Sequence, residues 1–139
     1  MSHTKLCSVA SLGTLGIRFQ GDRMVILGCG GDRDRFKRCE IAQIASRLAS
    51  LVVLTLDNPR TEDALQPILE MQKCAPDALV MPDRRVAIWY ALEVTSQNQT
   101  IFIVGKGDER SIEFRRLHIP YSDLKVVIEW EDQSQRKIL

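Results

Sequence analysis

One segment of the chain, RMVILGCGGDRDRFKR at residues 23–38, joins an apolar run to a glycine-rich turn and a basic stretch. The apolar residues are consecutive rather than alternating, which is typical of a strand covered on both faces, as in a parallel sheet. Gly28, Gly30 and Gly31 allow backbone N–H groups to face a ligand, and a helix that begins after them adds positive potential. The segment therefore predicts a strand, a turn that binds an anionic group, and a helix. The alternative is a glycine-rich turn with a solvated basic rim.

The rest of the chain repeats the alternation of apolar runs and helical patterns. Apolar runs follow at residues 51–56, 78–81 and 100–104. Helical patterns occupy residues 36–50 and 62–73, a third helix can begin after a capping Asp83, and a last one after a capping Ser122. This order of strands and helices predicts a doubly wound α/β fold.

The pattern also predicts the buried face of the third helix, a hairpin or edge strand, and a short helix near the start of the chain. On the third helix, the expected core residues are Val86, Trp89, Tyr90 and Val94, with Arg84 and Arg85 turned outward. Residues 111–120 alternate between apolar and polar side chains, which favours a hairpin or an edge strand after the parallel core. The spacing of Leu6, Val9 and Leu12 indicates a short helix near the start, although glycines weaken that pattern.

The composition fits one globular domain that spans residues 1–139. The net charge is +1, and 45% of the residues are hydrophobic and 27% charged. No apolar run approaches the ~18 residues of a membrane span, and the near-zero charge gives no reason to expect nucleic acid or a membrane as partner. The start of the chain also lacks the pattern of a secretory signal. We therefore expect a cytoplasmic protein with no metal site, whose four cysteines are free thiols.

Two further motifs follow predicted strands. In DNPRTED at residues 57–63, Pro59 fixes the turn and aims Arg60, and Thr61 can cap the next helix. Arg60 carries a positive charge just before that helix, where it is unfavourable, and a ligand carboxylate would relieve this. The alternative is an ordinary turn with good capping chemistry.

The motif GKGDE at residues 105–109 lacks the GxxxxGK[ST] pattern of a phosphate loop. Gly105 would let a ligand approach and Glu109 would accept a hydrogen bond from an ammonium group, while the alternative is a flexible glycine turn. Because the carboxyl ends of parallel strands meet at one edge of a sheet, the three motifs predict a site for a zwitterionic amino acid. Cys29 has no histidine near it in sequence and is not expected to be a nucleophile.

The three motifs, VILGCGGDRDR at residues 25–35, DNPRTED and GKGDE, resemble in order and spacing the C-terminal domain of the Mur ligase family. The resemblance is greatest to the diaminopimelate-adding branch of that family, the UDP-N-acetylmuramoyl-tripeptide synthetases. It covers nearly the whole chain from about His3 and includes IPYSD at residues 119–123. It implies a Rossmann-like three-layer α/β fold whose mostly parallel sheet carries an added antiparallel edge strand or hairpin.

The resemblance also implies roles for individual residues. The positions that match residues holding the far end of meso-diaminopimelate in the family are Arg33, Asn58, Arg60, Gly105 and Glu109. Asp57 and Pro59 would support them, and His3 would face a nucleotide. In the intact family enzyme, ATP phosphorylates a glutamyl carboxylate and the incoming amine attacks the acyl phosphate.

We therefore expect the amino-acid recognition domain of an ATP-dependent, amide-forming ligase of peptidoglycan precursor synthesis. ATP and magnesium would belong to the central domain of the intact enzyme, which is absent from this chain together with the N-terminal domain. The chain would hold no catalytic residue and no cofactor of its own, and it would act only with the missing ligase domains, in cis or in trans. One alternative is a stand-alone amino-acid-binding module or an inactive remnant. A nucleotide-binding Rossmann protein is the other, and the missing GxGxxG and phosphate-loop patterns count against it.

Overall fold

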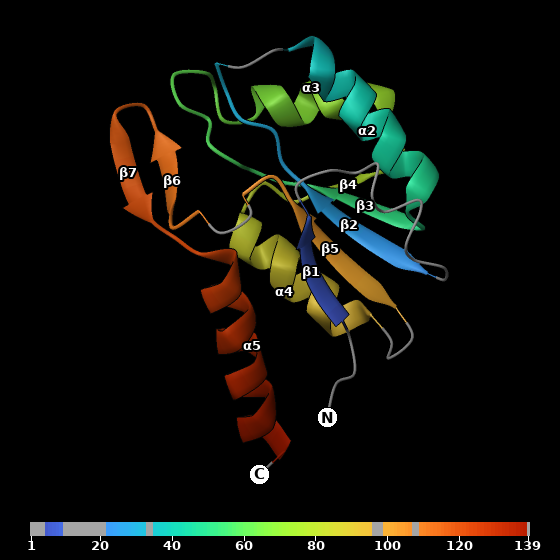
Figure 1. Cartoon of the computed structure of the whole chain (residues 1–139), viewed down its shortest axis with the longest axis vertical. Coiled ribbons are helices and arrows are strands. Elements are labelled where there is room, and N and C mark those ends of the chain that lie inside the picture. Colours follow the sequence, from blue (N-terminus) through green and yellow to red (C-terminus); the bar gives the residue numbers. More distant parts are fainter. Residues whose placement is uncertain (1–4, 10–21, 33–34, 96–98, 107–108, 139) are drawn as a thin grey trace.

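The computed structural model describes residues 5–9, 22–32, 35–95, 99–106 and 109–138. Its centre is a five-stranded parallel sheet in the order β1-β5-β2-β3-β4 (Figure 1). The strands are β1 (Lys5–Val9), β2 (Arg23–Leu27), β3 (Leu51–Leu54), β4 (Leu79–Val80) and β5 (Thr100–Val104). The four apolar runs predicted from sequence are therefore strands β2 to β5. The predicted short helix near the start was wrong, because residues 5–9 pair in parallel with β5 as a strand at the edge of the sheet.

Helices cover both faces of the sheet, which confirms the three-layer α/β fold (Figure 1). Helices α2 (Phe36–Leu48) and α3 (Gln66–Cys74) lie on one face, and α4 (Arg84–Val94) and α5 (Asp123–Ile138) lie on the other. Consecutive residues of one strand supply opposite cores: Val25 packs toward α2 and α3, and Ile26 packs toward α4 and α5. This double burial explains why the central strands carry apolar residues at consecutive positions.

The buried face of α4 differs from the predicted one. Val86 and Val94 are exposed, and the residues of α4 in the core are Ala87, Ile88, Ala91 and Leu92. The small side chains of the alanines allow the helix to approach the sheet closely. The buried face of α4 is therefore the one that carries the alanines, and not the one that carries the two valines. Trp89 of α4 and Trp130 of α5 pack against the same core from its margin.

Strands β6 (Ser111–Phe114) and β7 (Leu117–Pro120) form an antiparallel hairpin, as the alternating pattern predicts. The hairpin is a separate two-stranded sheet and does not extend the parallel one. It stands beyond the start of α5, on the side of the molecule where the carboxyl ends of the parallel strands lie (Figure 1). An isolated β-bridge between Arg60 and Phe114 is one of the contacts that join it to the turn after β3.

A disulfide joins α2 to α3, between Cys39 and Cys74. The expectation of free thiols was wrong for this pair, whose Cα atoms lie 5.3 Å apart although 35 positions separate them in sequence. The disulfide could not be predicted from sequence, because neither the spacing of the cysteines nor the composition shows which two helices pack side by side. Cys29 is a free cysteine.

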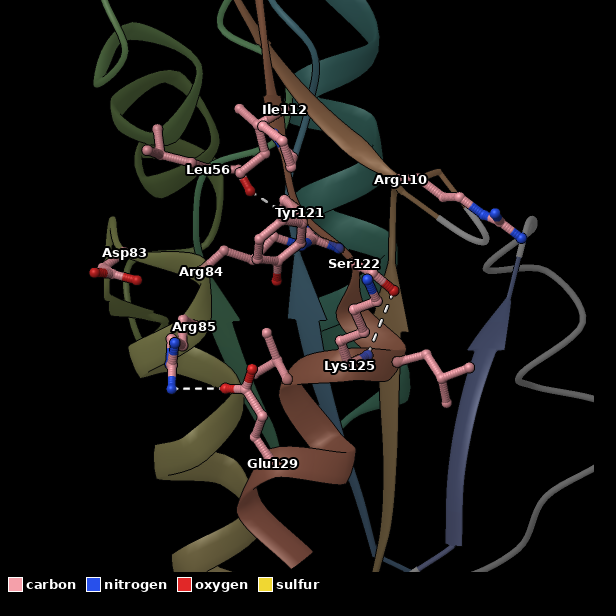
Figure 2. Close-up of a pocket in the computed structure, with 13 residues that line it drawn as sticks. Leu56, Asp83, Arg84, Arg85, Arg110, Ile112, Tyr121, Ser122, Lys125 and Glu129 are labelled. Carbon is pink, nitrogen blue, oxygen red and sulfur yellow. Dashed lines mark hydrogen bonds and ion pairs between the residues drawn. The ribbon is translucent and has the colours of Figure 1, made fainter. Parts of the chain in front are cut away.

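Arg84 points into the protein, contrary to the outward position predicted for it. Its Nε and Nη2 atoms donate to the two oxygens of Asp123, at 2.8 and 2.9 Å, and only 2% of its surface is exposed. The neighbouring Arg85 does face outward and pairs with Glu129 (Figure 2). A cavity of about 770 Å³ lies between the starts of α4 and α5 and the hairpin, and the charged groups Arg84, Arg85 and Glu129 on its wall have protein partners.

Candidate functional site

Three turns meet at the carboxyl edge of the sheet, as the parallel order requires. The turn after β2 packs directly on the turn after β3, where the Gly31 N–H donates to the Asn58 carbonyl oxygen at 2.6 Å. A Cβ atom at Gly31 would lie 1.8 Å from the carbonyl oxygen of Pro59, so only glycine permits this approach. Gly105, in the turn after β5, has a φ of 120°, a conformation that favours glycine, and a Cβ there would meet Asp57. Close contact between turns therefore accounts for Gly31 and Gly105 without a ligand.

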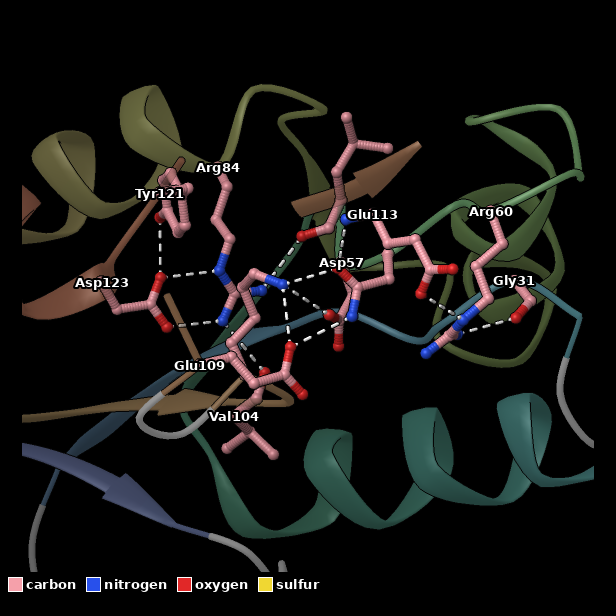
Figure 3. A network of polar contacts seen from close by, with 12 residues as sticks. Gly31, Asp57, Arg60, Arg84, Val104, Glu109, Glu113, Tyr121 and Asp123 are labelled. Atoms are coloured by element: carbon pink, nitrogen blue, oxygen red, sulfur yellow. Dashed lines mark hydrogen bonds and ion pairs between the residues drawn. The ribbon is translucent and has the colours of Figure 1, made fainter. Parts of the chain in front are cut away.

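A buried lysine ties two of these turns together. The ammonium group of Lys106 donates to Asn58 Oδ1 at 2.8 Å, to Glu109 Oε2 at 3.2 Å and to Asp57 Oδ1 at 3.3 Å (Figure 3). Its side chain is 0% exposed, so its positive charge is balanced by these acceptors and not by water. The Asn58 amide nitrogen in turn donates to Glu109 Oε2 at 3.1 Å. Asn58 and Glu109, predicted separately, are therefore direct neighbours.

Glu109 is held in its charged form at this site. Burial by itself would raise the pKa of Glu109, but hydrogen bonds from Asn58 and Lys106 outweigh it and bring the pKa below its ordinary value. Both of these hydrogen bonds end on Oε2. Among the described residues, no partner is found for Oε1, and 48% of the side chain is exposed. The carboxylate of Glu109 is therefore ionised and partly exposed, and its Oε1 is available to a ligand.

Arg60 has a protein partner that the sequence did not predict. Its Nε donates to Glu113 Oε2 at 3.2 Å and its Nη1 to the carbonyl oxygen of Gly31 at 2.9 Å (Figure 3). Helix α3 begins only at Gln66, so Arg60 does not stand at a helix start and the predicted unfavourable position was wrong. Thr61 does not cap that helix either, because its hydroxyl donates to Asp32. The Arg60 backbone has a φ of 54°, which is rare for a residue with a side chain.

Two of the four basic residues after the glycine turn are paired with carboxylates of the protein. Arg38 is 1% exposed and donates to Glu62 at 2.7 Å and to Glu70 at 2.7 Å. Arg35 also pairs with Glu70. Of the four basic residues at positions 33–38, two therefore serve to fix α2 against α3 and the loop before it. The surface is less attractive to an anion than the sequence indicates.

A cavity of about 470 Å³ opens between the glycine turn and the start of α2. Gly28, Gly30, Lys37, Asp57 and Gly105 are among the residues that line it. Cys29 also borders it, but burial and the negative charge of Asp57 raise the pKa of its thiol to about 11. A thiol with a pKa this high is protonated at neutral pH.

Two predicted site residues, Arg33 and His3, lie outside the described residues. Lys106 and Glu113 are the polar residues of the site that sequence reasoning missed. The motif that contains Lys106 lacks the pattern of a phosphate loop. Nothing in the neighbouring sequence indicates that the lysine is buried. Glu113 lies in a hairpin with an ordinary alternating pattern, and its contacts reach back 53 positions to Arg60.

Among the described residues, none of the helices combines the length and the apolar character that a membrane-spanning helix needs. In the same residues, no group of three or more His, Cys, Asp or Glu side chains is arranged to hold a metal ion.

A family model and individual ligases are similar to this chain in sequence. The family model described as "Mur ligase, glutamate ligase domain" matches residues 3–107. The UDP-N-acetylmuramoyl-L-alanyl-D-glutamate--2,6-diaminopimelate ligase of Halalkalibacterium halodurans is 39% identical over 114 residues, which are 81% of this chain and 24% of that ligase. The ligase of the same name from Coxiella burnetii is 37% identical over 127 residues, 89% of this chain and 26% of the relative.

A solved structure of a UDP-N-acetylmuramoyl-L-alanyl-D-glutamate--2,6-diaminopimelate ligase has the same fold. It superposes with a TM-score of 0.79 at 34% sequence identity, over 89% of this chain and 26% of the other. The chain spans about a quarter of the length of the relatives it matches.

Proposed function

This chain belongs to the Mur ligase family, and on that premise we propose that it is the domain that selects diaminopimelate in an amide-forming ligase of peptidoglycan precursor synthesis. The names of the similar ligases favour diaminopimelate over other amino acids. The proposal concerns recognition of the amino acid by this chain. The complete ligation would need further parts of a ligase, in cis or in trans.

One observation supports the proposal: within the described residues, Arg60 and Glu109 each have an atom available to a ligand, and their charges are opposite. Nη2 of Arg60 has no hydrogen-bond partner in the described part of the chain, while Nε and Nη1 are occupied. Oε1 of Glu109 is likewise without a partner there. An open guanidinium nitrogen suits a carboxylate and an open carboxylate oxygen suits an ammonium group. The far end of diaminopimelate carries both groups on one carbon atom.

Asn58 supports this assignment from between the two charged groups. Its side-chain oxygen accepts hydrogen bonds from Lys106 and from the Glu113 N–H, and its amide nitrogen donates to Glu109. We propose that Asn58 orients Glu109 and that Gly105, which is exposed beside them, gives the ligand access. Arg33 is proposed as a second carboxylate-binding residue from its place in the motif alone.

We propose that ATP and magnesium bind elsewhere in the assembled ligase. The sequence has no GxxxxGK[ST] phosphate loop, and the described residues offer no cluster of metal ligands. The described residues thus do not fit either group, and we assign them no step of the phosphate chemistry.

A chimera provides the test. The matched segment of the Halalkalibacterium halodurans ligase is replaced by this chain, and ATP-dependent joining of diaminopimelate to UDP-N-acetylmuramoyl-L-alanyl-D-glutamate is measured. Diaminopimelate should be joined and L-lysine, which lacks the far carboxylate, should be rejected. Arg60→Ala should lower kcat/KM for diaminopimelate by about 10- to 150-fold, the equivalent of ~1.5–3 kcal/mol for a hydrogen bond to a charged group.

Arg116→Ala is the matched control, because Arg116 is an exposed arginine of the hairpin turn. It should leave kcat/KM unchanged. The proposal is wrong if the chimera folds but joins no diaminopimelate, or if it accepts lysine equally well.

A further inference from the structure

Glu113 of strand β6 contacts both residues of the Asn58–Arg60 turn that we propose to serve the ligand. Its backbone N–H donates to Asn58 Oδ1 at 2.8 Å, and its backbone oxygen accepts from the Arg60 N–H at 3.1 Å. Its carboxylate accepts from Arg60 Nε at 3.2 Å. One residue of the hairpin therefore fixes an amide and a guanidinium that lie more than 50 positions away in sequence.

The backbone contacts explain how Arg60 keeps its unusual conformation. A positive φ is unfavourable for a residue with a side chain, and it persists only where surrounding contacts hold the backbone in that conformation. Besides Glu113, the hairpin supplies the N–H of Arg115, which donates to the Arg60 carbonyl oxygen at 2.7 Å. These bonds use backbone atoms, so they survive substitution of the Glu113 side chain.

The side chain of Glu113 has a separate effect, on the plane of the guanidinium group. That group is a rigid fork, and contacts at two of its nitrogens are enough to fix its orientation. Glu113 holds Nε and the Gly31 carbonyl oxygen holds Nη1 (Figure 3), and Nη2 has no partner among the described residues. Without the Glu113 carboxylate, the fork would be held at Nη1 alone and could rotate about that contact.

We propose that Glu113 is a positioning residue of the diaminopimelate site: it orients the Arg60 guanidinium so that Nη2 meets the far carboxylate of the ligand. This inference rests on the function proposed above. Glu113 acts through Arg60 and does not touch the reacting atoms. Its ion pair is partly exposed, with 33% of the Glu113 side chain accessible, and such pairs contribute little to stability. Loss of the carboxylate should therefore change ligand binding and leave the fold intact.

The test uses the active chimera and compares three variants. Glu113→Ala should raise KM for diaminopimelate about tenfold with kcat unchanged, since a charged hydrogen bond to the substrate would be misplaced. Glu113→Gln should restore most of the loss, because its amide oxygen can still accept from Arg60 Nε. Glu129→Ala removes a glutamate from another partly exposed ion pair, with Arg85, and should have no effect on KM.

The outcomes separate the inference from its premise. A chimera with the unchanged chain that makes no product overturns the proposed function, and the role of Glu113 with it. An active chimera in which Glu113→Ala leaves KM unchanged overturns the role of Glu113 alone. A fall in kcat together with a lower melting temperature would show that Glu113 serves the fold, and would also overturn the inference.

Discussion

The buried pair of Arg84 and Asp123 gives the sharpest prediction about stability. Arg84 places two donors on Asp123, and a third, Nη1, donates to the carbonyl oxygen of Leu56 at 3.0 Å. Arg84→Met would leave Asp123, which is 4% exposed, as a buried charge without its cation. Removing one partner of a buried ion pair costs about 3–5 kcal/mol. That is a large part of the ~5–15 kcal/mol by which a domain is stable.

The loss can be measured as a shift in melting temperature. An unfolding entropy of about 2.1 cal/mol/K per residue, applied to the 139 residues of the chain, converts ~3–5 kcal/mol into a decrease of roughly 10–17 °C. Thermal unfolding followed by circular dichroism at pH 7 measures it directly. Arg84→Met combined with Asp123→Asn should recover part of the decrease, because no uncompensated charge then stays buried.

The neighbouring arginine is the matched control. Arg85 pairs with Glu129 at 2.7 Å, but the two side chains are 51% and 48% exposed. Arg85→Met should therefore cost only ~0–1 kcal/mol, less than about 4 °C. Two single variants that melt at the same temperature, or a double variant that melts no higher than Arg84→Met alone, would refute this account of the buried pair.

Three further predictions concern the loops and helices around the site. Hydrogen bonds from Arg35 and Gln66 lower the pKa of Glu70 from its ordinary 4.5 to about 2, so its contribution to stability is present above pH 4.5 and is lost as the pH falls toward 2. Glu70→Gln should flatten the decrease in melting temperature over this interval, and an equal slope in both proteins would contradict it. Gly31→Ala should lower the melting temperature and weaken diaminopimelate binding together, because its Cβ would lie 1.8 Å from the Pro59 oxygen; an unchanged calorimetric titration would refute this. Reduction of the disulfide should cost up to about 4 kcal/mol for a closed loop of 35 residues, so dithiothreitol should lower the melting temperature of the unchanged chain and have no effect on Cys39→Ser.

The fold could be predicted from sequence because its strongest signals are local. Each central strand is a short continuous apolar run, and residues 100–104 match β5 at both ends. The hairpin followed from alternation in the same way. The errors occurred where burial depends on distant parts of the chain. Helix α4 buries Ala87 and Ala91, which periodicity ranks below the larger Val86 and Val94.

The candidate site could be predicted in part, for a topological reason. Parallel strands bring their carboxyl ends to one edge, so the turns that contain Asn58 and Gly105 had to be neighbours. The partners of the charged residues could not be predicted, since ion pairs leave no periodic signal. Arg38 reaches Glu62 and Arg60 reaches Glu113 across 24 and 53 positions. Basic residues interpreted as ligand-binding from sequence are therefore, in part, internal counter-ions.

This internal compensation bears on the kind of ligand that the site can accept. Around the open atoms, the described residues place two cations, Arg60 and Lys106, among three carboxylates, Asp57, Glu109 and Glu113. A phosphate or a bare dicarboxylate would add negative charge beside these three carboxylates, which costs free energy in a partly buried site. An α-amino-acid end group brings its own ammonium with its carboxylate and leaves the balance unchanged. The acidic partners of Arg60 and Lys106 thus support the proposal that the site binds a zwitterion.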